Sequence, residues 1–499
     1  MIILTERTPA ARKRGLRRLG RCAALAAPLL WMVGCGAEES GPIAPRPTPG
    51  MAVFSGNNQR GAPGQPLPNP LQVLLTDRNG FSAGAGARVA WVVAGGGGRV
   101  ASDTTLTTGN GTAAAVWTLG IGVGGQALKA VWPGVDSVML HATATGAFGA
   151  PLGGNNVPER FTSDLWVANG YAYAGTWNHV QRTPSVAGVI KVFQLGPSGA
   201  ATLVDSVPLP TVNTVSDLEV SADGAWLVAT TEGGSGEGLY AFSLTDPAKP
   251  VQKAFLAVSA GLHTGSLAVI GGKLFAFAAK NPPDPALLIV DLSDAANGVI
   301  DQASSTPIPP YYGIHDTFVR DGICFAFVWN EGVYIYDVGN GGWGGSPTDP
   351  VKVSGLRTSG GEAHNGWWFW NPATGERRYL FVGQEGPGTI GTGSSGDIHV
   401  VDVSDLAHPV EVASYSMPGA GTHNFWMDEQ GQRLYAAYYN GGVVALDVSG
   451  TLQGSLASRE IARVKPGGSG NTYIWGVMLV GSSLYASDML SGLWQLGVP

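Results

Sequence analysis

Leu287-Leu288-Ile289-Val290-Asp291-Leu292 is the clearest copy of a motif that recurs through the C-terminal part of the chain. The motif is an apolar run that ends in a polar residue and an aliphatic one. Seven copies occur, and their polar positions are Gln194, Ser243, Asp291, Asp337, Asp402, Asp447 and Gln495. Successive copies are 49, 48, 46, 65, 45 and 48 residues apart. A repeat of this length predicts one supersecondary unit per copy.

Each period holds four short apolar runs, and a glycine turn precedes the run that carries the motif. No segment has a sustained 3.6-residue period, which argues against a helical solenoid. Four short strands per repeat are typical of the blades of a β-propeller. The sequence therefore predicts an all-β fold with a seven-bladed β-propeller over residues 159–499.

The repeats show one irregular interval and one missing strand. The long interval, between Asp337 and Asp402, contains an insertion at Asn371–Arg378 and a glycine-rich stretch at Gly386–Gly396. The seventh repeat ends on its third strand, so a closed ring needs a fourth strand from elsewhere in the chain. We expect a short strand near Val157–Phe161 to supply it.

The repeat strand also resembles a known family. Leu287-Leu288-Ile289-Val290-Asp291 and Ile398-His399-Val400-Val401-Asp402 are similar to the strand that names the LVIVD-repeat family of secreted propellers, and Asp405-Leu406-Ala407-His408-Pro409 is similar to the turn after it. The resemblance covers residues 160–499 and implies the propeller architecture. It implies little about function, because most members of the family are uncharacterised.

Residues 51–145 have another pattern, with short alternating runs separated by turn-rich pieces, which predicts an all-β sandwich. Leu75-Thr76-Asp77-Arg78-Asn79-Gly80, Val89-Ala90-Trp91-Val92-Val93 and Thr107-Thr108-Gly109-Asn110-Gly111-Thr112-Ala113 resemble the bacterial Ig-like domains of invasin and intimin. That resemblance implies an Ig-like domain that acts as a stalk or spacer. Residues 146–158 are rich in Gly and Pro and are expected to be a linker.

The N-terminus has the features of a bacterial export signal. Seven basic residues in the first 21 precede an apolar run, Cys22–Val33, that is too short to span a bilayer. The run ends in Met32-Val33-Gly34-Cys35, which resembles a lipobox. We expect residues 1–34 to be the signal peptide, Cys35 to be lipidated, and residues 35–50 to be a flexible linker. The alternative is ordinary signal cleavage that leaves Cys35 as a free thiol.

The charge and the cysteine content limit the kinds of partner that we expect. Without residues 1–34 the chain has 22 basic and 35 acidic residues, a net charge of −13. This balance repels phosphate backbones, so no nucleic-acid partner is expected. Cys324 would have no cysteine partner and lies in an apolar run, which favours a buried structural thiol. We expect an exported monomer that meets the membrane only through its lipid, at the outer membrane or cell surface.

Two sets of repeated polar residues are candidates for chemistry. Four of the repeat strands end in an aspartate at the same place in the repeat, which favours a structural role in a turn or an inter-blade hydrogen bond. These residues are Asp291, Asp337, Asp402 and Asp447. A second set opens the innermost strands, which converge on one mouth of the channel. Its members are His315-Asp316, His364-Asn365 and His423-Asn424, with Asp217 at the matching place in repeat two, and His263 and Trp475 close to it in repeats three and seven.

Imidazole is the commonest metal ligand and suits proton transfer near neutral pH. Three or four converging histidines could hold copper or zinc, and calcium is a further possibility, although no cofactor is certain. The alternative is that the histidines bond to neighbouring backbones and seal the channel.

Two functions therefore stay open. The first is a non-catalytic cell-surface protein that binds a protein or glycan ligand through its propeller, with adhesion as the role. The second is a metal-dependent extracytoplasmic enzyme, an oxidoreductase or hydrolase, with its site at the histidine mouth. The chain has no nucleotide-binding glycine loop, no His-Glu-x-x-His motif and no Gly-x-Ser-x-Gly motif, so no catalytic residue is predicted.

Overall fold

The computed structural model describes residues 48–154, 160–177, 188–196, 200–309 and 313–499. The predicted signal peptide, Cys35 and most of the predicted linker that follows lie outside the described residues. Within the described residues, no helix is long and apolar enough to cross a membrane.

Residues 50–144 form two main β-sheets around one core. The first sheet contains β1 (Gly50–Ser55), β3 (Leu71–Thr76) and β7 (Thr112–Ala115), and the second contains β2 (Gln59–Gly61), β10 (Asp136–Ala144), β9 (Gly124–Trp132), β4 (Arg88–Gly95) and β6 (Thr104–Leu106). A short pair joins β5 (Arg99–Val100) to β8 (Trp117–Thr118). Alternate residues of β3 are buried, and Leu71, Val73 and Leu75 pack with Trp91 and Trp117. The alternation seen in the sequence therefore places one face of β3 in the core.

The C-terminal part contains seven sheets of four or five strands in the described residues, and their strands are antiparallel except for one parallel pair, between β33 and β37. Three sheets are β12 (Phe161–Ala168), β13 (Tyr171–Trp177), β14 (Gly188–Gln194) and β15 (Thr202–Leu209); β16 (Thr214–Val220), β17 (Trp226–Glu232), β18 (Gly238–Ser243) and β19 (Val251–Ala257); and β20 (Leu262–Ile270), β21 (Lys273–Lys280), β22 (Ala286–Asp291) and β23 (Asp301–Pro307). A short 3-10 helix, η1 (Ala295–Asn297), lies between β22 and β23.

The remaining sheets follow the same plan. They are β24 (Asp316–Arg320), β25 (Ile323–Phe327), β26 (Val333–Asp337) and β27 (Val351–Leu356); β28 (Ala363–Asn371), β29 (Glu376–Gln384), β32 (Ile398–Asp402), β33 (Val410–Tyr415) and β37 (Gly454–Ser455); β34 (Phe425–Asp428), β35 (Arg433–Ala437), β36 (Val443–Asp447) and β38 (Glu460–Val464); and β39 (Ile474–Val480), β40 (Ser483–Asp488), β41 (Gly492–Gly497) and β11 (Leu152–Gly153). A second 3-10 helix, η2 (Ala457–Arg459), precedes β38.

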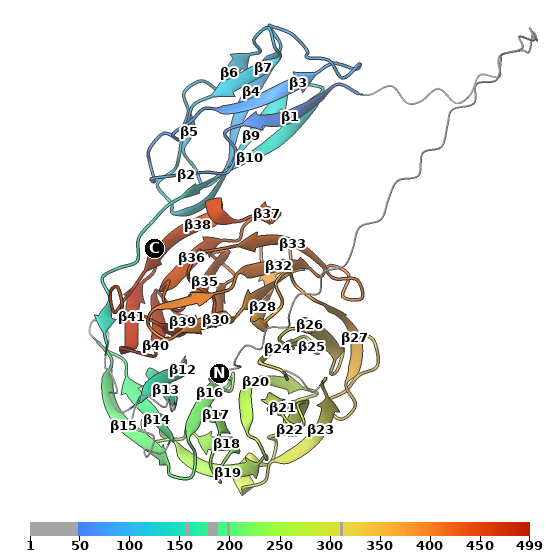
Figure 1. Ribbon diagram of the computed structural model, residues 1–499. Helices are drawn as coiled ribbons and strands as arrows, with labels where there is room; N and C mark the ends of the chain where they lie inside the picture. Colours follow the sequence, from blue (N-terminus) through green and yellow to red (C-terminus); the bar gives the residue numbers. More distant parts are fainter. Residues whose placement is uncertain (1–47, 155–159, 178–187, 197–199, 310–312) are drawn as a thin grey trace, which may run out of the picture. The chain divides into compact units, whose positions relative to one another are not determined.

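The first strands of these sheets surround a common axis (Figure 1). Each first strand contacts the first strand of the next sheet, from β12 to β16 and onward, and β39 returns to contact β12. Radial sheets around an axis are the arrangement of a β-propeller. The predicted propeller fold is therefore confirmed, and the polar residue of the repeat motif lies on the third strand of each sheet.

The strand that completes the last sheet is not the expected one. Leu152 pairs with Gln495 and Gly153 with Trp494, so β11 supplies the fourth strand. The prediction of a strand near residues 157–161 was wrong: residues 155–159 lie outside the described part, and Phe161 begins β12. A two-residue strand has no alternation to detect. Gly153 has φ 118, and a Cβ there would lie 2.5 Å from the Leu493 carbonyl oxygen, so the close approach requires glycine.

The long repeat interval is explained by two local additions. β28 and β29 extend into a long hairpin around the predicted insertion, and β30 (Gly386–Thr389) pairs with β31 (Gly393–Ser395) in the glycine-rich stretch. Both additions precede β32, so they lengthen the repeat without changing the order of its main strands.

The repeated aspartates stabilise turns. Asp337 accepts hydrogen bonds from the backbone N–H groups of four residues, Gly339, Gly341, Trp343 and Gly345, at 2.7–3.3 Å. Asp291, Asp402 and Asp447 each accept a hydrogen bond from the backbone N–H two residues later. These contacts agree with the predicted structural role. Cys324 also has the environment of a structural thiol. It is fully buried in an apolar cluster, and burial raises the pKa of its thiol.

Candidate functional site

The predicted polar residues lie where the first strands begin. His315 directly precedes β24, and His423 lies two residues before β34. Their backbone N–H groups donate to the Phe327 and Ala437 carbonyls at 2.8 Å. His263 and His364 lie inside β20 and β28, at places where pairing with the second strand shifts register. Such bulges turn a side chain away from the regular strand direction.

The side chains at these openings form a closed circle with one tryptophan from a second strand. Neighbouring ring centroids in the circle lie 4.2–6.1 Å apart. In order, the members are His263, His315, His364, His423, Trp475 and Trp177. We call this set the histidine ring. Trp329 stacks on His315 from outside the circle, at 4.1 Å between centroids.

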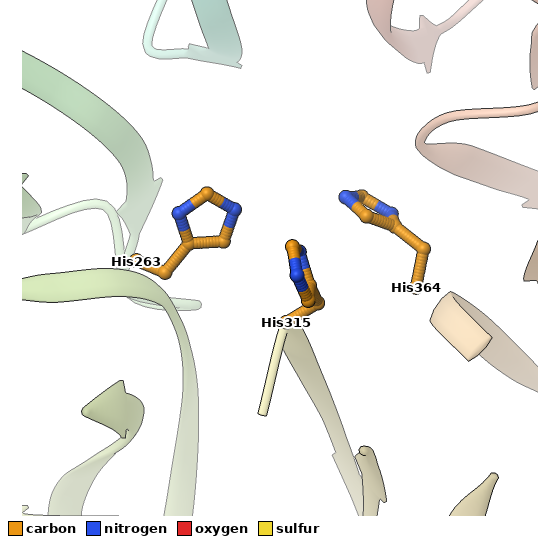
Figure 2. Close-up of side chains that lie close together, drawn as sticks. All are labelled: His263, His315 and His364. Atoms are coloured by element: carbon orange, nitrogen blue, oxygen red, sulfur yellow. The ribbon is translucent and has the colours of Figure 1, made fainter. Parts of the chain in front are cut away.

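Three of the imidazoles converge. One ring nitrogen from each of His263, His315 and His364 lies within 4.8 Å of the other two (Figure 2). Two ligands of one metal ion, at about 2.0–2.1 Å each, can be at most about 4.2 Å apart. Side-chain movements of less than about 1 Å would therefore bring the three nitrogens to one ion. His423 lies beside His364, with ring centroids 4.2 Å apart, but outside this convergent set.

Hydrogen bonds orient two of the rings. His263 Nδ1 lies 2.6 Å from Glu232 Oε1, which also accepts from Asn281 Nδ2 at 2.9 Å. His423 Nδ1 lies 2.7 Å from the Trp475 carbonyl oxygen. A carbonyl oxygen can only accept, so Nδ1 of His423 carries the proton and Nε2 keeps its lone pair. A carboxylate or carbonyl on the other nitrogen is the usual outer partner of a metal-bound histidine.

The electrostatics favour neutral imidazoles. Burial, followed by the neighbouring histidines, lowers the pKa of His315 well below its usual value. Burial and the charge of His263 lower the pKa of His364 to about 3, and the pKa of His423 is lowered mainly by burial. His263 is the exception, because the Glu232 carboxylate outweighs burial and raises its pKa. His315, His364 and His423 thus each keep a free lone pair at neutral pH.

The donor set fits a transition metal. Nδ1 of His315 and Nδ1 of His364 are buried and have no hydrogen-bond partner within the described part of the chain. An unpartnered buried nitrogen is costly unless something else binds it. Imidazole nitrogens suit copper and zinc, whereas calcium requires oxygen ligands, so of the predicted metals calcium does not fit these residues.

A second set of residues, at the ends of the second strands, was missed from the sequence. In an antiparallel hairpin the end of the second strand lies beside the start of the first. Trp177 and Glu232 end β13 and β17, and Trp329, Glu385 and Tyr439 lie one or two residues after β25, β29 and β35. An alignment of the repeats at the second strand would have shown that all five residues lie at the same end of their sheets as the histidines.

Two of these residues have unusual backbones. Trp329 has φ 45 and Tyr439 has φ 38, values that residues other than glycine rarely adopt. Each also forms a bridge to the next sheet, Trp329 with Ala363 and Tyr439 with Ile474. Tyr439 donates its hydroxyl to Glu385, whose other oxygen lies 3.7 Å from His364 Nε2. Backbone strain of this kind concentrates at functional sites.

The polar residues next to the histidines face a separate space. Asp217, Asp316, Asn365 and Asn424 line a cavity of about 250 Å³, and none of the histidines lines it. The sequence predicted one mouth with both sets of residues. The structure separates them into the histidine ring and this cavity, which we call the acidic cavity.

Comparison with known proteins gives limited results. The family model described as LVIVD repeat matches residues 393–417. No curated protein matches the chain. Among solved structures, the Cps50 (Swd1) β-propeller domain of Myceliophteria thermophila is similar with 13% identity and a TM-score of 0.46, over 69% of this chain and 99% of that domain. The propeller assignment rests on the sheet topology and the LVIVD repeat.

Proposed function

We propose that the chain binds a copper ion in its histidine ring, with His263, His315 and His364 as ligands. The convergence of their nitrogens within 4.8 Å carries this proposal. The unpartnered nitrogens of His315 and His364 support it, and so does the carboxylate that orients His263. Of the two functions open at the sequence level, this supports the metal-dependent one.

Copper is preferred to zinc for two reasons. Nitrogen donor sites bind Cu²⁺ more tightly than Zn²⁺ in the Irving–Williams order. Oxidisable rings also lie beside the ligands, since Trp329 stacks on His315 and Trp177 contacts His263. Three protein ligands leave a coordination position open for a substrate, as in catalytic metal sites. An extracytoplasmic oxidoreductase is the activity that this arrangement supports.

Elemental analysis of the full-length protein from copper-replete cells tests the proposal. We expect stoichiometric copper in the wild type. In the double variant His315→Ala, His364→Ala we expect affinity to fall more than the about 100-fold that outer-shell changes cause. His408→Ala is the matched control, because His408 is exposed and contacts only Asp405 among the interactions described.

Three results would contradict this assignment. Wild-type protein without copper after copper-replete growth would overturn the site, and so would copper retained by the double variant. Stoichiometric zinc in place of copper would overturn the redox assignment and indicate a hydrolytic site. Circular dichroism of the double variant shows whether metal loss reflects lost ligands or lost folding.

The arrangement of the whole chain is part of the proposal. We infer that the seven sheets are the seven blades of one closed ring. The protein is exported and is anchored at the outer membrane through Cys35. Residues 51–145 form an Ig-like stalk. Sequential sheets whose first strands contact around an axis support the blade count. Two sheets over a shared core support the Ig-like assignment. Metabolic labelling with a fatty acid, compared between wild type and Cys35→Ala, tests the anchor.

The protein- or glycan-binding role stays a prediction. It was inferred from the order of anchor, stalk and propeller. Among the described residues, the large apolar side chains that are exposed belong to many different strands and loops, and examples are Phe81, Ile121, Val269 and Val410. Scattered single residues of this kind are normal on protein surfaces.

A further inference from the structure

The acidic cavity is built by every sheet of the propeller. Its lining comes from β12, β16, β20, β24, β28, β34 and β39 or from residues directly before them. Four carboxyl groups from three sheets line it: Asp164 on β12, Asp217 and Glu219 on β16, and Asp316 on β24. The cavity of about 250 Å³ is large enough for a small molecule and is too large for a bare metal ion alone.

Four aromatic side chains line the same cavity and touch one another. Trp166 lies 5.8 Å from Trp426, Trp426 lies 5.2 Å from Trp367, and Trp367 lies 5.1 Å from Phe318, measured between ring centroids. They occupy equivalent places, two residues after Asp164, Asn424, Asn365 and Asp316. The rings thus form a belt along one level of the cavity, and the polar groups form the adjacent level.

The carboxyl groups have no cation of their own. None of the four forms an ion pair within the residues that the structure describes. Arg320, a cation that lines the cavity, pairs with Glu429 and donates to the Trp368 carbonyl oxygen. Its guanidinium also lies over the rings of Phe318 and Trp367, at 5.3 and 5.9 Å from their centroids. Glu219 accepts a backbone hydrogen bond from Leu267 at 2.9 Å. Because Glu429 neutralises Arg320, the four unpaired carboxyl groups favour a cationic ligand.

Burial makes this lack of a cation costly. Burial raises the pKa of Asp164 and of Glu219 well above their usual values, so both carboxyls favour the neutral form while the cavity is empty and would lose their protons when a cation binds. Asn365 lines the same cavity, is 2% exposed, and its Oδ1 has no hydrogen-bond partner within the described residues. Buried carboxyl and amide oxygens of this kind are stabilised when a donor or a positive charge fills the space between them.

We propose that the acidic cavity binds a small organic ammonium ion. Trp166 and Trp426, the two rings of the belt over which Arg320 does not lie, would attract the cation through their π-systems, and the carboxylates would neutralise its charge. A bare calcium ion would leave most of the about 250 Å³ unfilled and would make no use of the ring faces. The inference goes beyond the copper site and does not depend on it, because the two sets of side chains are different.

Isothermal titration of the full-length, metal-free protein tests this inference. The probes are choline and 3,3-dimethylbutan-1-ol, which has the same shape but no charge. We expect choline to bind at least ten-fold more tightly than the alcohol, because only the cation gains from the rings and the carboxylates. Since copper is absent, failure of the copper proposal would leave this result unchanged.

Variants assign the binding to the cavity. Glu219→Gln keeps an oxygen for the Leu267 N–H and removes the charge, so we expect at least a ten-fold loss of choline affinity. Trp426→Leu should weaken binding as well, through the loss of one ring face. Asp301→Asn is the control, because Asp301 is exposed on β23, outside the cavity.

The outcomes are distinct. Equal affinity for choline and the alcohol would overturn the proposal, as would full affinity in Glu219→Gln. Saturable calcium binding without choline binding would overturn it in favour of an inorganic site. The thermal unfolding midpoint of each variant is measured in parallel, and Asp217→Asn replaces Glu219→Gln if the latter does not fold.

Discussion

The first and third strands of the propeller repeats both carry a polar residue at a fixed place, yet the two sets of residues have different partners. On the third strands, Asp402 accepts from Ser404, two residues away in the same repeat. On the first strands, Asp217 accepts from Gly265 of the next sheet. His423 likewise contacts the carbonyl of Trp475 in the next sheet. Regular spacing alone does not distinguish the two sets, but the location of their partners does.

In a repeat protein, the location of the partner of a polar residue indicates the role of that residue. A repeated polar side chain that is satisfied inside its own repeat stabilises that repeat and nothing else. One that contacts the neighbouring repeat, or is left without a partner, lies at a shared surface where a ligand can bind. His315 and His364 are of the second kind, because each keeps an unpartnered Nδ1 within the described part of the molecule.

The largest expected effect among single substitutions is on metal affinity. Glu232→Ala removes the carboxylate that lies 2.6 Å from His263 Nδ1, so the imidazole loses its orientation. We expect copper affinity to fall about 10- to 100-fold. Competition with a chelator of known affinity measures it.

Two further variants decide whether Glu232 acts by positioning His263. Glu232→Gln keeps an acceptor oxygen and should restore part of the affinity, whereas Glu376→Ala, at the exposed start of β29, should change nothing. A purely structural role for Glu232 would lower the unfolding midpoint and leave copper affinity in the folded fraction unchanged. That result would contradict the positioning role of Glu232.

The sequence predicted the propeller and its repeat register because both depend on local pattern. In three of the repeats the third strand is a buried apolar run that ends in an aspartate, so Val290, Val401 and Leu446 stand out at matching positions. The closing strand β11 was misplaced because its two residues are held by pairing with β41, more than three hundred residues away in the chain. Pairing at that distance leaves no periodic signal.

The candidate site was predicted only in part, for a similar reason. The openings of the first strands were identified, and His263, His315 and His364 do converge. Glu232 and Trp177 were missed because strand ends of the second strands were not compared between repeats. The separation of the acidic cavity from the histidine ring could not be predicted, because it depends on bulges in β16, β20 and β28 that change which way successive side chains point.

Substitution of Asp337, on the third strand β26, should lower stability and leave copper binding unchanged. Asp337→Asn removes the charge that accepts four backbone hydrogen bonds, and we expect the free energy of unfolding to fall by about 2 kcal/mol at pH 7. Denaturant unfolding measures it, and copper content serves as the control. A loss of copper in a variant that is still folded would contradict the comparison, because Asp337 contacts its own turn alone in the described hydrogen bonds.

The effect of Asp337 should also depend on pH. Although burial acts in the opposite direction, the backbone N–H groups hold the pKa of Asp337 below its usual value in the folded protein. Its stabilising contribution is therefore fully present above the unfolded pKa, about 3.9, and is lost as the pH falls through the folded value. The difference in stability between wild type and Asp337→Asn should be constant from pH 7 to pH 5 and should shrink below about pH 4.

Among the third-strand aspartates, the smallest loss of stability is expected on substitution of Asp402. Its carboxylate accepts from Ser404 and from Arg378, but the Arg378 side chain is 45% exposed. Solvent screens an ion pair of this kind, so Asp402→Asn should lower the free energy of unfolding by less than about 1 kcal/mol. The same measurement in high salt should reduce the difference further. A loss as large as that of Asp337→Asn would show that the aspartates act through their position in the repeat, and not through the number of backbone groups that each one satisfies.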